Sequence, residues 1–147
     1  MGDRAHVHIT IGGILPRELF PELIRRAQLY DLRTEWDGDP FDDAALTSEE
    51  NPYAGKPLDL YGMELNGGLT DDVDAFCIEH GLVFHRWSGD CPGAFNPEIV
   101  VFDGSGPLRD YSANEDGDLL FSPQEIAKFS RMRDLKRAIA LAQIIVP

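Results

Sequence analysis

The sequence lacks the features that mark membrane, secreted or disulfide-stabilised proteins. No stretch approaches the run of about 18 apolar residues that a transmembrane helix needs. No charged-then-apolar leader opens the chain, which starts MGDRAHVHITIGG, so we expect no secretory signal. Two cysteines in 147 residues cannot form a disulfide framework, and we therefore expect a reducing, cytoplasmic compartment.

Basic residues are also scarce. Lys and Arg number 13 against 26 Asp and Glu, which gives a net charge of −13. Nucleic acids and anionic membranes are bound through Lys and Arg, so we expect neither as a partner. The charge is uneven, because residues 1–123 carry −16 and residues 124–147 carry +3. The simpler interpretation of this basic end is a helix face exposed to solvent. Alternatively, it docks on an acidic surface, either of its own chain or of a second copy. Docking on a second copy predicts a homo-oligomer, and a different protein partner is also possible.

The hydrophobic pattern predicts an α+β fold in a single domain over 1–147. Strands are expected at 6–11, 31–36, 58–65, 82–87, 98–102 and 118–121, and helices from Pro16 or Pro21, over 71–80 and over 122–147. A long acidic loop is expected at 37–57. The first six elements match the βαββαβ split of a ferredoxin-like antiparallel sheet, with an added edge hairpin and a C-terminal helix.

The first strand sets the orientation of the predicted sheet. Val7, Ile9 and Ile11 alternate with His6, His8 and Thr10, so the aliphatic and the polar side chains point to opposite faces. We expect the aliphatic face beneath the helices and the two imidazoles on the open face.

A histidine cluster on that open face is the first candidate site. His6 and His8 are spaced as in a two-histidine metal grip, and His85 on a later strand can share their face, with Asp59 or Tyr61 as further ligands. This predicts zinc or another divalent metal, in a metal-dependent protein or a small enzyme. The simpler interpretation is that the imidazoles cover a polar face or an interface, to which Tyr61 and Trp87 would add aromatic contacts.

The segment 114–125, NEDGDLLFSPQE, resembles the calcium loop of the EF-hand family. The resemblance implies calcium ligation by Asn114, Asp116, Asp118 and Glu125. It departs from the family at Leu119, where a glycine normally permits the turn. A hairpin turn followed by a helix-capping box from Ser122 to Glu125 explains the same residues without calcium.

No complete catalytic motif is present. Cys77 and His80 share a helix face, but Cys77 lies on its apolar stripe, where a thiol is inert. Neither a phosphate-binding loop nor a nucleophile elbow occurs. The sequence therefore favours a non-enzymatic interaction or regulatory module without a cofactor, which self-associates through the open sheet face or the closing helix.

Overall fold

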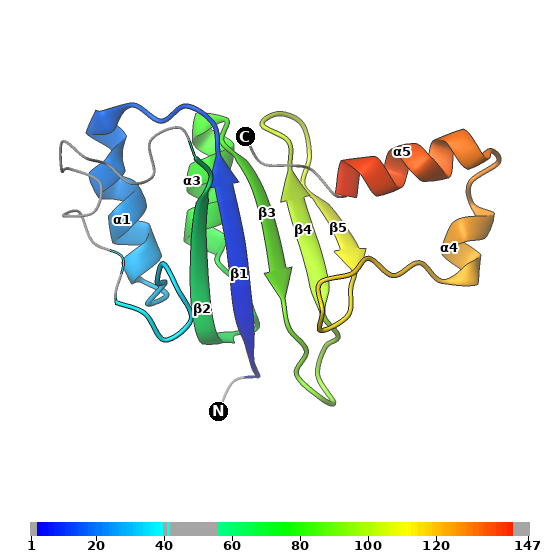
Figure 1. Ribbon diagram of the computed structural model, residues 1–147, viewed down its shortest axis with the longest axis horizontal. Coiled ribbons are helices and arrows are strands. Elements are labelled where there is room, and N and C mark those ends of the chain that lie inside the picture. The colour runs from blue at the N-terminus through cyan, green and yellow to red at the C-terminus, as the bar shows by residue number, and fades with distance from the viewer. Residues whose placement is uncertain (1–2, 40, 42–55, 143–147) are drawn as a thin grey trace.

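The computed structural model describes residues 3–39, 41 and 56–142, which form an antiparallel sheet with helices. The five strands are ordered β2-β1-β3-β4-β5, and every neighbouring pair is antiparallel (Figure 1). The α+β class is thereby confirmed. The elements are β1 (Arg4–Gly12), a 3-10 turn η1 (Arg17–Leu19), α1 (Phe20–Gln28), β2 (Leu58–Asn66), α3 (Asp71–His80), β3 (Val83–Ser88), β4 (Glu98–Phe102), β5 (Arg109–Ser112), α4 (Pro123–Ala127) and α5 (Met132–Ala142).

The ferredoxin-like topology is not confirmed. The segment 31–36, expected to be a strand, forms only one bridge, between Arg33 and Tyr61. β1 and β2 are joined through a helix and yet are antiparallel neighbours. One split βαβ unit does occur, because β2 and β3 both run antiparallel to β1, which lies between them, and α3 connects the two. Most of the predicted 37–57 loop, at 40 and 42–55, lies outside the described residues.

The helix boundaries follow the local signals. Pro21 stands in the first turn of α1, after the 3-10 turn η1, because a proline ring is tolerated there and not further along a helix. The predicted bounds of α3 are confirmed, and Gly81 ends it in a left-handed conformation with φ of 65°. Thr70, which precedes α3, makes no capping bond, and its hydroxyl donates to the Asp74 carboxylate instead.

The C-terminal part differs from the prediction in two ways. The edge strand is β5, whereas the expected strand at 118–121 forms one bridge, Ala113 with Leu119. The closing helix is not continuous: α4 and α5 are separated at 128–131, and 143–147 lie outside the described residues. α4 ends in i→i+3 bonds at Lys128 and Phe129, which tighten and stop a helix, and Ser130 favours helix ends over helix interiors. The capping box of Ser122 and Glu125 is present as predicted.

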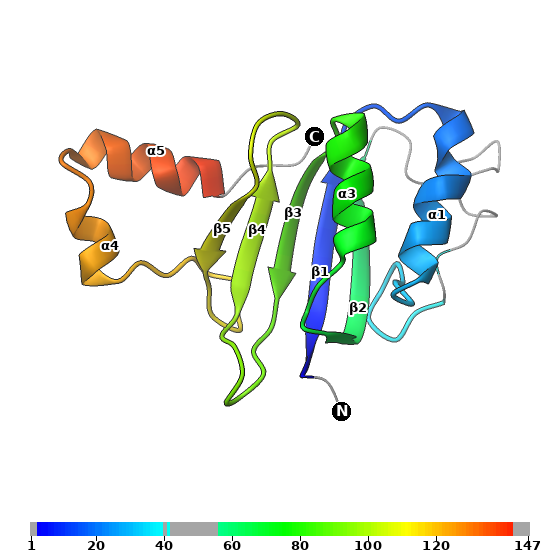
Figure 2. The ribbon, with the colours of Figure 1, turned by 180° about the vertical axis from the view of Figure 1, so that it is seen from behind.

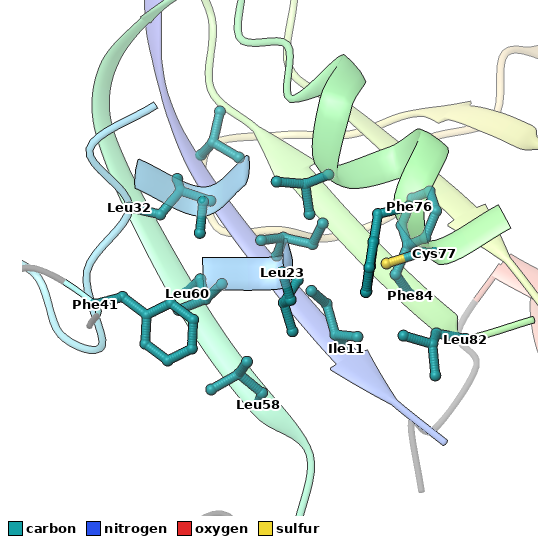
Figure 3. Packing of buried hydrophobic residues seen from close by; sticks show 14 of the residues in the cluster. Ile11, Leu23, Leu32, Phe41, Leu58, Leu60, Phe76, Cys77, Leu82 and Phe84 are labelled. Carbon is teal, nitrogen blue, oxygen red and sulfur yellow. The ribbon is translucent and has the colours of Figure 1, made fainter. Parts of the chain in front are cut away.

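The main core lies between one face of the sheet and the helices α1 and α3. Figure 2 shows α3 in front of this face, with α1 beside it. Val7 and Ile9 of β1 are fully buried and Ile11 nearly so, which confirms the predicted orientation of the first strand. Figure 3 shows ten labelled members of this cluster: Ile11, Leu23, Leu32, Phe41, Leu58, Leu60, Phe76, Cys77, Leu82 and Phe84.

Candidate functional site on the uncovered sheet face

The opposite face of the sheet is toward the viewer in Figure 1. The strand pairing places two parallel rows of side chains on it. The strand registers align consecutive partners across all five strands, and cross-strand partners project to the same face. The four strand residues that the sequence allowed on this face beside His8 therefore lie there: Asp59, Tyr61, His85 and Trp87. The first row is Tyr61, His8, Trp87, Ile99 and Tyr111, and the second is Asp59, Thr10, His85, Val101 and Arg109.

The two ends of these rows have different surroundings. Over β4 the face is closed, because Ile99 and Val101 are buried in a second apolar cluster against Trp87. The indole N–H of Trp87 donates to the carbonyl of Asn114 over 2.9 Å, so this side chain is held by its own chain. The end over β1 and β2, which carries Tyr61 and His8, is not closed by any of the described helices (Figure 1).

Four rings follow one another at this open end, and we call them the ring row: His6, Trp36, Tyr61 and His8. Successive ring centroids lie 5.7, 4.8 and 4.4 Å apart, and His8 stacks on Tyr61 with an interplanar angle of 10°. Trp36 is 45% exposed, which is unusual for so large an apolar side chain. The ring row is therefore an aromatic surface that remains accessible.

Sequence reasoning missed the role of Trp36, which it placed within a strand. The main chain of Arg33 exchanges two hydrogen bonds with Tyr61, of 2.9 and 2.7 Å, and then turns. Asp37, the next residue after Trp36, has a left-handed φ of 57°. The turn directs the chain so that the indole contacts Tyr61 and His6. The signal in the sequence was the Asp37-Gly38 pair, which favours a turn.

His8, Asp59 and Thr10 form a polar contact beside the ring row. His8 Nε2 lies 2.9 Å from Asp59 Oδ1, and the Thr10 hydroxyl donates to the same oxygen over 2.7 Å. An ionised carboxylate only accepts hydrogen bonds, so this geometry assigns the imidazole proton to Nε2. A metal at Nε2 would have to displace this contact.

His6 is held by a different bond. The amide of Glu64 donates to His6 Nδ1 over 3.4 Å, from a residue whose φ is 55°. This places the proton of neutral His6 on Nε2 and leaves no lone pair directed to solvent. Among the residues that the structure describes, no group of three His, Cys, Asp or Glu side chains is arranged to hold a metal ion. Metal binding by His6, His8 and His85 stays a prediction.

The electrostatics of the open end favour cations. Burial raises the pKa of Tyr61, and the negative charges of Asp59 and Glu35 raise it further. Burial lowers the pKa of His85, and a charge on His8 lowers it further. Tyr61 thus lies within the fields of two carboxylates, whereas the nearby cation Arg33 is paired with Asp31 at 3.0 Å.

The predicted calcium loop serves as a turn and a helix cap. The Asn114 side-chain oxygen accepts from the amides of Asp116 and Asp118, and its amide group donates to the Asp118 carboxylate. Glu125 accepts from the amide of Ser122 in the capping box. These contacts account for the residue types of Asn114, Asp118 and Glu125, whereas Asp116 contributes only its main-chain amide. Calcium binding stays a prediction.

The two cysteines are not partners. Cys77 is fully buried, and burial together with the nearby Asp74 raises its pKa to about 12. His80 packs its ring on Phe76, with the centroids 4.5 Å apart. Cys91 is a half-buried free thiol. Within 3–39, 41 and 56–142, no helix is long and apolar enough to cross a bilayer.

No protein-family model, curated protein or solved structure matches this chain. An accessible row of rings flanked by carboxylates suits a cationic partner, since ring faces attract guanidinium and ammonium groups. Trp and Tyr are also the residues that contribute most to protein interfaces.

Proposed function

We propose that this protein is a non-enzymatic interaction module that associates with further copies of itself through its C-terminal helices. We call residues 123–142, which comprise α4 and α5, the basic arm. The basic arm lies beyond β5, at the end of the sheet opposite to α1 (Figure 1). Ile126 and Met132 on the arm are 45% and 64% exposed, and α4 has no buried residue. Exposed apolar side chains on a projecting helix support a docking role.

The charges of the basic arm carry the proposal. Within the described residues, four of its five cations form no ion pair, and Arg133 has only its neighbour Asp134 at 3.8 Å. By contrast, five of the eight cations in residues 1–123 are paired with carboxylates of their own chain. The unpaired cations of the arm are Lys128, Arg131, Lys136 and Arg137.

The rest of the chain offers these cations the complementary charge. Residues 1–123 hold 24 acidic side chains against eight basic ones. Attraction between oppositely charged surfaces speeds association and orients the partners, and buried apolar area adds affinity. The expected partner is a second copy, in the cytoplasmic setting that two free cysteines favour.

Light scattering coupled to gel filtration tests the proposal at two ionic strengths. At about 0.1 M salt the charges interact over ~10 Å, and at about 1 M over ~3 Å. We expect a mass above that of one chain at low salt and a shift toward the monomer at high salt. Lys136→Glu/Arg137→Glu should be monomeric at both. The control Arg17→Glu/Lys56→Glu reverses two exposed cations outside the arm and should behave as wild type.

A wild-type protein that is monomeric at both ionic strengths would overturn the proposal. So would an arm variant that associates as well as the wild type does. In either case the acidic body would not be the partner of the arm.

The alternative function is a metal-dependent protein. The observation in its favour is that His8 and Asp59 lie 2.9 Å apart, on the same face as His85. Elemental analysis of protein purified without a histidine tag or chelator decides between the two proposals. Stoichiometric zinc that is lost in His8→Ala would support the alternative, and no stoichiometric metal would end it.

A further inference from the structure

The basic arm and the ring row lie at opposite ends of the molecule. The ring row is over β1 and β2, whereas the arm follows β5, at the other edge of the sheet. β2 and β5 are four strand spacings apart, about 19 Å. α5 is 11 residues long, or about 16 Å, and it runs back to contact β5, at the edge of the sheet opposite to β2 (Figure 1). The arm therefore does not cover the ring row of its own copy.

The ring row offers aromatic rings and carboxylates, which complement the cations of the basic arm. Trp36 is 45% exposed, and Tyr61 lies next to it with ring centroids 4.8 Å apart. Glu35 is exposed, and the side chain of Asp59 is 46% exposed, so both carboxylates reach solvent. A guanidinium or ammonium group can contact an aromatic face and a carboxylate at once in this place.

No cation of the described residues already fills the site. Arg33 is the nearest along the chain, and its guanidinium donates to the carbonyl of Gly38 and to the carboxylate of Asp31. The ring contacts of Trp36 are with His6 and Tyr61. The acidic, aromatic surface thus complements a positively charged segment that must come from another molecule.

Resting on the proposed function, we infer that the ring row, with Asp59 and Glu35, is the surface that accepts the basic arm of a second copy. The cations Arg133, Lys136 and Arg137 recur along one side of α5, and the apolar Met132, Leu135 and Ile139 along the other. The cationic side meets the carboxylates and ring faces, and the apolar side adds contact area. The two surfaces differ, so each copy has one basic arm that binds and one ring row that is bound.

Complementation between two defective variants tests this pairing directly. The arm variant is Lys136→Glu/Arg137→Glu, and the row variant is Trp36→Ala/Glu35→Lys. Each should fail to associate alone, with a dissociation constant at least about tenfold weaker than wild type. A 1:1 mixture should associate again, because the arm variant keeps an intact ring row and the row variant keeps an intact arm.

A matched control separates the ring row from general surface effects. Leu29→Ala/Glu18→Lys removes exposed apolar area and reverses one exposed charge near α1. This control should associate like the wild type. Thermal melts establish that each variant is folded. If the row variant does not fold, Asp59→Asn/Glu35→Lys keeps both aromatic rings and tests the same surface.

The outcomes distinguish the two proposals. A row variant that associates like the wild type, or a mixture that does not regain association, overturns the ring row as acceptor. Self-association through the arm then stands if the arm variant alone is defective. A wild-type protein that is monomeric at low salt overturns both.

Discussion

Arg86 and Asp74 meet in the interior between β3 and α3, with Arg86 Nη1 2.5 Å from Asp74 Oδ2. The two residues are 3% and 6% exposed. The hydroxyl of Thr70 joins them, since it accepts from the same Nη1 and donates to Asp74, both over 2.8 Å. Burial raises the pKa of Asp74, although the guanidinium and the Thr70 hydroxyl act in the opposite direction. Arg86 Nε has no hydrogen-bond partner among the described residues.

Removing either partner of this pair should destabilise the fold strongly. Asp74→Leu leaves a buried guanidinium without its counter-charge, and Arg86→Met leaves a buried carboxylate, each at a cost of about 3–5 kcal/mol. The double variant Asp74→Leu/Arg86→Met removes both charges and should cost less than either single change. Urea denaturation of the four proteins measures this coupling. Additive effects of the two changes would contradict it.

The stability of the protein should fall as the pH drops below neutrality, because of His85. Burial and the charge of His8 lower the pKa of His85 in the folded state, so the unfolded chain binds its proton first. The contribution is complete above the ordinary pKa of about 6.5 and is lost as the pH falls toward the lowered value, with a slope of at most ~1.4 kcal/mol per pH unit. Urea denaturation between pH 7.5 and 5.5 measures the slope.

Two variants assign this slope to His85. His85→Gln should reduce it, because the group that titrates is gone. Val83→Ala, on the same strand and face, should lower the stability and keep the slope. An unchanged slope in His85→Gln would show that other groups cause it.

The two cysteines should differ sharply in reactivity. Cys77 is buried with its pKa raised to about 12, so the thiolate that reacts is nearly absent at pH 8. Iodoacetamide should therefore add one label to the folded protein, at the half-buried Cys91, and two labels in urea. Mass spectrometry counts the adducts. Cys91→Ser should take up none when folded, and a label on Cys77 would show that α3 opens readily.

The turn that ends α3 should require glycine. Gly81 has φ of 65°, a conformation that costs other residues about 1–2 kcal/mol. Gly81→Ala should lower the unfolding free energy by about that amount, since a methyl group there meets nothing closer than the Gly104 carbonyl at 3.5 Å. Chemical denaturation measures the change. Glu79→Ala, at an exposed position of the same helix, should cost much less.

The elements with a strong period were predictable from the sequence. The alternation of Val7, Ile9 and Ile11 identified an interior strand and its buried face, and the bounds of α3 followed from its apolar period and Gly81. β5 was missed because its four residues, 109–112, are half-buried or exposed and show no apolar alternation. A short edge strand gains its place from pairing with β4, which the local sequence does not encode.

For the candidate site, the sequence predicts which face of the sheet the side chains share, but not their positions relative to one another. Alternation along the strands brings His8, Tyr61, His85 and Trp87 to one side, but their order depends on strand register. The pairing of β1 with β2 shifts between Ala5 and Val7, and periodicity does not reveal such a shift. The exposure of Trp36 and the internal hydrogen bond of Trp87 depend on loops, whose course is set by tertiary contacts.

The bridge between Arg33 and Tyr61 also constrains how copies can join. β2 is an outermost strand, and its free side would invite a strand of another molecule. The two main-chain bonds of Arg33 occupy that side in the middle of the strand, while Leu120 bonds to Ser112 at the opposite margin. Growth by strand addition is thus interrupted at both margins, so contacts between side chains, and not between strand edges, determine which surface of a neighbouring copy is bound.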